Sequence, residues 1–217
     1  GATVAIEGFG KVGGGVARYM ARSGAKVVAI STIKGAIYNP NGIDVEKLLE
    51  MRKTYGDDVV LKYEDAERIE KEKLFFLPVD ILVPGARPYV INKDNAHMIR
   101  AKIICPGANI PTTDDAEKIL FQRGIISVPD FIANGGGVLA GVVDRLGGDE
   151  NQAFRMIEQL IGSLTKRVLS EAKDSNVPPR TVAVKIAKQR VTEAIKRREQ
   201  KSLEELRELV RERFKIT

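Results

Sequence analysis

Three glycines near the start of the chain have the spacing of a dinucleotide-binding turn. Gly8, Gly10 and Gly13 form Gly-x-Gly-x-x-Gly, with an apolar run at residues 4–6 before it and an apolar helical pattern after it. In such a turn the first glycine allows the tight bend, the second lets the backbone approach a pyrophosphate, and the third lets the helix pack closely on the strand. The phosphates then lie at a helix N-terminus, where unpaired N–H groups favour an anion. The pattern predicts a dinucleotide site; the alternative is a turn that is merely closely packed.

The residues after the second apolar run indicate which dinucleotide would bind. An acidic side chain at the end of this strand usually holds the adenosine ribose of NAD, but here Ser31 and Thr32 follow and no Asp or Glu occurs before Asp44. Without that carboxylate a 2′-phosphate is not repelled, and Lys34 can attract it as a point charge. We therefore expect NADP, with NAD possible. The alternative for Lys34 is a cation that only solvates a loop.

The strands and helices around these residues can be predicted from the periodicity of apolar residues, which changes along the chain. Over residues 1–147, short β-branched runs alternate with amphipathic segments, as expected for buried parallel strands joined by helices. This alternation predicts an α/β fold, a doubly wound and mostly parallel Rossmann sheet. We expect strands at 4–6, 26–30, 79–83, 102–105 and 124–128, and helices from Val12 to Ser23-Gly24, over 44–55 and from Thr112 to Gly124, the first with Val12, Val16, Tyr19 and Met20 on one face.

The remainder of the chain, residues 148–217, has helical patterns only, and we expect these helices to pack on the Rossmann domain. A stripe from Phe154 to Val168 is broken by Pro178-Pro179, and a second helix is expected over 180–198. Ser202 and Glu205 have the spacing of a capping box that opens a last helix. The apolar stripe of that helix either packs on its own domain or is meant for a domain that this chain lacks.

Composition narrows the class of protein. The 217 residues carry a net charge of +6, but basic residues are interleaved with acids, which indicates a solvated surface and no nucleic-acid partner. We find no apolar stretch long enough to anchor the chain in a membrane. Cys105, the single cysteine, excludes an internal disulfide and fits a reducing, cytoplasmic setting; within its apolar run we expect an inert buried thiol. One His and one Cys cannot form a His/Cys metal site. Abundant Lys, Glu and Ile hint at a thermophilic source.

Several motifs that occur in order along residues 2–198 resemble one family. Together they look like the coenzyme domain of the glutamate/leucine/phenylalanine/valine dehydrogenases, and the Ile-Tyr-Asn-Pro-x-Gly-Ile-Asp stretch looks most like the glutamate branch. The motifs lie at Gly8–Gly13, Ser31–Asp44, Asp80–Pro84, Gly107–Thr113 and Val128–Val138.

The resemblance implies reversible oxidative deamination of an L-amino acid to a 2-oxo acid, with hydride transfer to NAD or NADP. It implies that Asn134 lies near the nicotinamide and the substrate, and that Gly141 takes the place of a serine that helps to hold the glutamate side chain, which puts a preference for glutamate in doubt. Lys11 replaces the family's usual Asn. The implied coenzyme contacts are Phe9, Gly10, Lys11, Val12 and Gly13 at the pyrophosphate, Ser31 and Thr32 at the adenosine ribose, and Ala86, Gly107, Ala108 and Asn109 towards the nicotinamide ribose.

In this family the catalytic Lys and Asp belong to an N-terminal substrate domain, and no segment of this chain resembles that domain. We therefore expect no catalytic residue here, and a chain that binds coenzyme without turning over substrate alone, because hydride transfer needs both walls of the cleft. The expected partners are the substrate domain, an amino-acid or 2-oxo-acid substrate, and further copies in a full-length homo-oligomer. The alternative is a free-standing, non-catalytic NAD(P)-binding regulatory protein.

Overall fold

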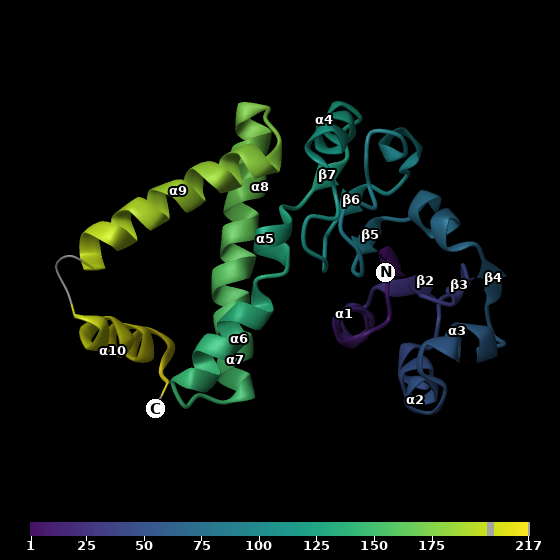
Figure 1. Cartoon of the computed structure of the whole chain (residues 1–217), viewed down its shortest axis with the longest axis horizontal. Helices are drawn as coiled ribbons and strands as arrows, with labels where there is room; N and C mark the ends of the chain where they lie inside the picture. Colours follow the sequence, from purple (N-terminus) through teal and green to yellow (C-terminus); the bar gives the residue numbers. More distant parts are fainter. Residues whose placement is uncertain (199–201, 217) are drawn as a thin grey trace. The chain divides into compact units, whose positions relative to one another are not determined.

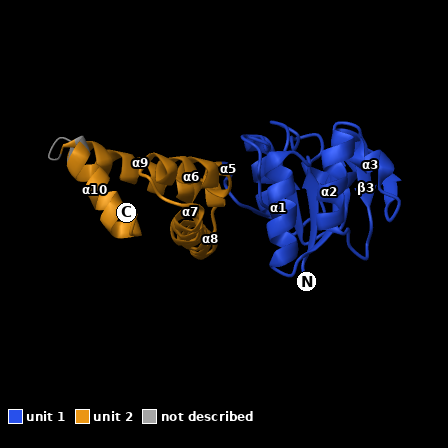
Figure 2. Cartoon of the chain, turned by 90° about the horizontal axis from the view of Figure 1, so that it is seen from below, with its two compact units in different colours: residues 1–130 blue, residues 131–217 orange. Residues whose placement is uncertain are grey.

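The computed structural model describes residues 1–198 and 202–216. The chain divides into two compact units, residues 1–130 and 131–217 (Figure 2). The hydrophobic periodicity of the sequence predicts a domain boundary after residue 147, whereas in the structure the first unit ends at Asp130. The reason is that α6 (Gly136–Arg145) packs within the second unit, where Val143 is buried against Met156. That the C-terminal helices pack on the Rossmann domain stays a prediction.

Within the described residues, the first unit is built on one seven-stranded sheet, in the order β4-β3-β2-β1-β5-β6-β7 (Figure 1). The five predicted strands are present and pair in parallel, which confirms the doubly wound α/β fold. They are β1 (Thr3–Glu7), β2 (Lys26–Thr32), β5 (Ile81–Pro84), β6 (Ile103–Ile104) and β7 (Ile126–Ser127). Sequence periodicity missed β3 (Gly35–Tyr38) and β4 (Glu67–Ile69), which are too short to show a pattern and add an antiparallel edge beside β2.

Both faces of the sheet are covered, so successive residues of a strand enter different cores. In β1, Val4 and Ile6 join the cluster beneath α1 (Lys11–Arg22), α2 (Val45–Tyr55) and α3 (Val59–Lys62). Ala5, between them, joins the cluster beneath α4 (Asp114–Gln122) and the 3-10 segments η2 (Lys71–Phe76) and η3 (Ala96–Met98). A short 3-10 turn, η1 (Gly56–Asp58), links α2 to α3. This burial on both sides explains why the parallel strands read as nearly continuous apolar runs.

The helices begin and end at the predicted signals, but the buried face of α1 differs from the prediction. Asp44 caps α2 by accepting a hydrogen bond from the Lys47 amide at 3.0 Å, and Thr113 caps α4. Val12 and Tyr19, expected on the buried face of α1, are 53% and 46% exposed. Gly13, Gly14 and Ala17 are the buried residues of this helix, because small side chains let it lie close to the sheet.

The second unit is helical throughout. The predicted stripe forms one continuous helical column, α7 (Glu150–Ile157), a π-helical turn η4 (Glu158–Gly162) and α8 (Ser163–Ser175), visible in Figure 1. It ends at Asn176, which has φ +50°, just before the two prolines, and α9 (Pro179–Arg198) then packs back on α8. A four-residue helix, α5 (Asp130–Ala133), lies at the boundary between the units.

The last helix, α10 (Leu203–Phe214), opens with the predicted capping box between Ser202 and Glu205. Its stripe packs at least in part on its own unit, because Val210 and Phe214 contact the cluster of Val143 and Met156. The side chain of Leu203, also expected in this stripe, lies outside the described residues. No helix in the described part of the chain is both long enough and apolar enough to cross a bilayer.

Candidate functional site

A pocket of about 280 Å³ lies at the carboxyl end of β1, where the order of the parallel strands reverses between β2 and β5. In open α/β sheets the ligand crevice lies at this position. Six predicted site residues line the pocket: Gly8, Phe9, Gly10, Ser31, Thr32 and Ala86. The other lining residues were not predicted: Glu7, Ile33, Arg52, Asp57, Lys71 and Arg87.

The three glycines of the turn differ in their backbone conformation and in the space around them. Gly8 has φ +87°, and a Cβ atom there would lie 2.8 Å from the Cβ of Ala86. A Cβ at Gly13 would lie 1.9 Å from the carbonyl oxygen of Gly8, so only glycine lets α1 pack on the turn. A Cβ at Gly10 would meet nothing within 4 Å, which leaves its backbone open to a ligand. Gly8 and Gly13 thus serve the fold, whereas Gly10 faces free space.

The first turn of α1 is suited to an anion. Gly10 is the N-cap and offers no side-chain acceptor, and the first turn contains no acidic residue. The N–H groups of Lys11 and Val12 precede the first backbone bond of the helix, from the Gly14 amide to the Gly10 carbonyl at 2.8 Å. Unpaired N–H groups and the helix dipole favour negative charge here, and the exposed Lys11 adds a cation.

The two hydroxyls at the end of β2 are buried and already engaged. Ser31 Oγ accepts a hydrogen bond from the Gly8 amide at 3.1 Å, which ties β2 to the glycine turn. Thr32 Oγ1 donates to the Asp57 carbonyl at 2.7 Å. It also accepts from the amide of Lys34 at 3.1 Å. Ser31 can still donate its own proton to a ligand, whereas the Thr32 proton is used within the protein.

The Lys34 side chain lies beside Asp58, outside the pocket. It is exposed, and its Nζ lies 3.8 Å from Asp58 Oδ1, whose side chain is exposed as well. Lys34 is not among the residues that line the pocket.

A buried carboxylate connects β1 to the loop after β5. Glu7, 3% exposed, accepts a hydrogen bond from the Ala86 amide at 3.2 Å and from Arg87 Nε at 2.7 Å. Sequence reasoning missed this pair, although Glu7 directly precedes the glycine turn and Arg87 directly follows Ala86. The pair holds Ala86 beside Gly8 at the mouth of the pocket.

The loop after β6 reaches the same edge of the sheet. The amides of Gly107 and Ala108 both donate to the Pro84 carbonyl, at 3.0 and 3.1 Å, and a Cβ at Gly107 would lie 3.0 Å from Val12 Cγ1. Gly107 therefore lies close to the start of α1. Asn109 follows and is exposed.

Two residues near this edge have an unusual backbone. Ile110 and Tyr89 have φ +49° and +56°, a region that a β-branched side chain such as Ile rarely adopts. The Tyr89 amide donates to the Ile110 carbonyl at 2.9 Å, and the Ile110 amide donates to Asp130 Oδ2 at 2.9 Å. These bonds hold both residues in the strained conformation.

The two remaining predicted residues belong to the second unit. Asn134 is half-buried in the turn between α5 and α6, and Gly136 and Gly137 form the first turn of α6. Gly141 is exposed on α6, and a Cβ there would meet nothing within 4 Å. The place of Asn134 near the nicotinamide and the substrate, and of Gly141 beside the substrate side chain, stays a prediction.

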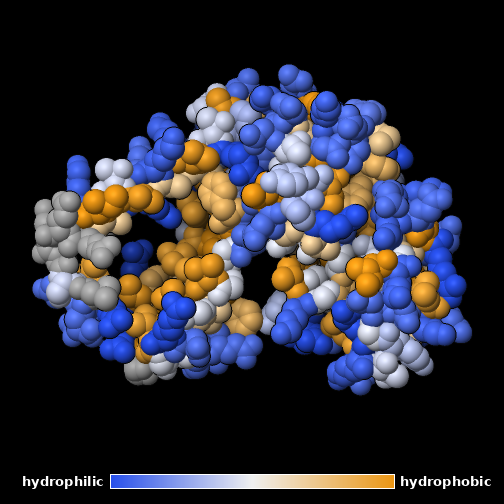
Figure 3. Space-filling model, in the orientation of Figure 1, coloured by the Kyte–Doolittle hydropathy of each residue, from blue (hydrophilic) through white to orange (hydrophobic). Residues whose placement is uncertain are grey.

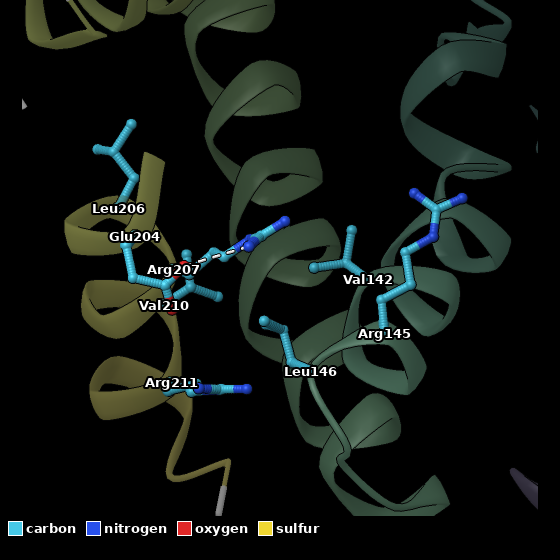
Figure 4. Close-up of a pocket in the computed structure, with 8 residues that line it drawn as sticks. All are labelled: Val142, Arg145, Leu146, Glu204, Leu206, Arg207, Val210 and Arg211. Carbon is cyan, nitrogen blue, oxygen red and sulfur yellow. Dashed lines mark hydrogen bonds and ion pairs between the residues drawn. The ribbon is translucent and has the colours of Figure 1, made fainter. Parts of the chain in front are cut away.

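The second unit contains a pocket of its own, of about 480 Å³, between α6 and α10 (Figure 4). It is lined by four apolar side chains, by Glu204 and by three arginines, of which Arg207 is paired with Glu204 at 3.2 Å. It has no strand end and no glycine turn, so the smaller pocket at β1 is the better candidate site despite its size. Apolar atoms are also open to solvent over these helices (Figure 3); on α9 they include Val184, Val191 and Ile195.

Cys105 follows β6 and is half-buried, so the sequence expectation of a fully buried residue is met only in part, and the inertness of its thiol stays a prediction. Burial raises the pKa of this thiol above its ordinary value.

The strand order, the glycine turn and the pocket at the switch point define an α/β domain of the Rossmann type. The sequence model of the glutamate/leucine/phenylalanine/valine dehydrogenase family matches residues 1–199, and the chain belongs to this family.

Individual relatives agree with the family match. The chain is 41% identical over 208 residues to a glutamate dehydrogenase from Aeropyrum pernix, covering 91% of this chain and 49% of that one. It is 37% identical over 206 residues to an NADP-specific glutamate dehydrogenase from Saccharolobus shibatae, covering 91% and 48%. The leucine-bound, hetero-hexameric glutamate dehydrogenase from Thermus thermophilus has a similar structure, with a TM-score of 0.78 and 29% identity over 89% of this chain and 47% of that chain. The chain thus spans about half the length of these relatives.

Proposed function

We propose that this chain is the coenzyme-binding domain of an amino-acid dehydrogenase similar to glutamate dehydrogenase. The observation that carries the proposal is the pocket at the β1 switch point, with the open backbone of Gly10 at its edge. The family membership and the relatives named glutamate dehydrogenase support the reaction, a reversible oxidative deamination of an L-amino acid to a 2-oxo acid.

The residues present fit a dinucleotide. The amides of Lys11, Val12 and Gly13 would bind the pyrophosphate, and Ser31 would donate a hydrogen bond to the adenosine ribose. Gly107, Ala108 and Asn109, with Ala86, would border the path towards the nicotinamide ribose. The coenzyme supplies the hydride acceptor, while this chain binds and orients it.

NADP is the proposed coenzyme, with NAD as the weaker ligand. No acidic side chain occurs at the end of β2, where Ser31 and Thr32 stand, so a 2′-phosphate would meet no carboxylate from this strand. The NADP-specific relative from S. shibatae is consistent with this choice.

The substrate site would be completed by a second part of the enzyme, corresponding to the half of the relatives that this chain does not match. We propose that Asn134 lies near the nicotinamide and the substrate, with Gly141 beside the substrate side chain. The full-length enzyme would be a cytoplasmic homo-oligomer. Because the catalytic Lys and Asp of the family belong to the substrate domain, the chain alone would bind coenzyme without turnover.

Calorimetric titration with NADPH and with NADH tests the proposal. We expect both to bind, NADPH more tightly, and we expect no glutamate-dependent formation of NADPH by the purified chain. Binding of neither coenzyme would refute the proposed site. Measurable turnover would refute the need for a second domain.

Gly10→Val separates binding from folding. Its Cβ would meet no protein atom within 4 Å, so the variant should fold like the parent but fill the space that the pyrophosphate needs. Gly15→Val is the matched control, because Gly15 lies on the same helix and is equally open. Loss of binding in both variants would point to a damaged helix and away from a blocked site.

A further inference from the structure

The cations that line the β1 pocket differ in their partners. Arg52 Nη1 lies 2.8 Å from Asp57 Oδ1, and Arg87 Nε lies 2.7 Å from Glu7 Oε1. Lys71 is the third lining cation, and among the described residues no carboxylate lies within ion-pair distance of it. The pocket thus contains two compensated arginines and one uncompensated lysine.

Lys71 is tied to the end of β2 from a distant part of the chain. It is the first residue of η2 and is half-buried, and its Nζ donates a hydrogen bond to the Ile33 carbonyl at 3.3 Å. Ile33 directly follows Ser31 and Thr32, where this fold places the adenosine ribose. An ammonium group has three donors, so two remain for a ligand.

Lys34, the lysine that the sequence draws attention to, is less suited to the same task. Its side chain is exposed and shares its charge with Asp58, and it does not line the pocket. A cation with a carboxylate partner attracts a phosphate less than one without, because the partner offsets its field.

We infer that Lys71, and not Lys34, binds the 2′-phosphate of NADP and sets the coenzyme preference of this domain. The inference rests on the proposed function, since it assigns a residue to the phosphomonoester of the proposed coenzyme. Two carboxylates line the pocket, and each has an arginine partner: Asp57 pairs with Arg52, and Glu7 pairs with Arg87. Lys71 therefore supplies the net positive charge at that end of the pocket.

The test compares Lys71→Ala with Lys34→Ala by calorimetric titration with NADPH, NADH and 2′,5′-ADP, which carries the 2′-phosphate without the nicotinamide. A charge-assisted hydrogen bond corresponds to roughly tenfold or more in affinity. We expect Lys71→Ala to weaken NADPH and 2′,5′-ADP by about that factor and to leave NADH within about twofold. Lys34→Ala should leave all three within about twofold.

Two further variants keep the outcome clear. Lys71→Arg retains the charge and should keep most of the NADPH preference, whereas Lys71→Glu should reverse it. Equal weakening of NADPH and NADH by Lys71→Ala would overturn the inference, because the Ile33 bond would then be structural. A loss of NADPH binding confined to Lys34→Ala would overturn it as well. If the parent chain binds NADH but not NADPH, the domain assignment stands and the inference fails; if it binds neither, the proposed function fails first.

Discussion

Replacing Gly13 by alanine tests whether α1 is held against β1 by a contact that only glycine permits. The added Cβ would lie 1.9 Å from the Gly8 carbonyl oxygen, whereas real Cβ atoms almost never approach a heavy atom within 3.0 Å, so helix and turn must separate by about 1 Å. Overpacking of this kind costs about 1–3 kcal/mol, and the cost lies at the upper end because the atom that the Cβ meets is a backbone carbonyl oxygen, which cannot rotate away. Alanine in a helix interior regains about 0.5–1 kcal/mol. We expect a net loss of about 2 kcal/mol in the free energy of unfolding.

Gly15→Ala is the matched control, because Gly15 lies in the same helix and its added Cβ meets nothing within 4 Å. It should stabilise the chain by about 0.5–1 kcal/mol. Urea unfolding followed by circular dichroism gives the midpoints, and hydrogen exchange of the β1 amides reports the first unit separately from the helical unit. With an m-value of about 2 kcal/mol/M, the Gly13 variant should unfold at about 1 M lower urea than the parent. If the two variants are equally stable, the close contact does not exist and the reasoning is wrong.

Three other measurements probe the same unit. The Lys102 ammonium holds the pKa of Asp80 well below its usual range. The stability that Asp80 contributes is therefore present above the unfolded-state pKa near 3.9 and is lost as the pH falls through the folded-state pKa. In urea titrations, Asp80→Asn should lower the stability at pH 7 and flatten its decline below about pH 4. Arg87→Ala leaves the buried Glu7 carboxylate without its guanidinium partner and should lower the free energy of unfolding by about 2 kcal/mol. Adding Glu7→Gln should recover part of this loss, and no recovery would mean that Arg87 acts through packing alone. Because burial raises the pKa of the Cys105 thiol, Ellman's reagent should react with the folded chain at least roughly tenfold more slowly than with the chain in urea, and equal rates would contradict this burial.

Those parts of the fold that depend on neighbouring residues could be predicted from the sequence. The five parallel strands were predicted from short β-branched runs, because burial on both faces makes such runs continuous. The cap at Ser202 was predicted because its side chain bonds to the amide of Glu205, only three residues away. The turn from Gly8 to Gly13 was predicted for the same reason, since its requirements lie within six residues.

The charged groups that share the pocket could not be predicted in this way, because they come from distant parts of the chain. Lys71 meets Ile33 across 38 positions of the chain, and Arg87 meets Glu7 across 80. Such pairs follow from the strand order, which places the ends of β1, β2 and β5 at one edge of the sheet, and periodicity does not specify that order. Lys34 was chosen from the sequence because it is near Ser31 in the chain, yet its side chain lies beside Asp58. Nearness along the chain fixes turns and caps, whereas nearness in space depends on how the strands assemble.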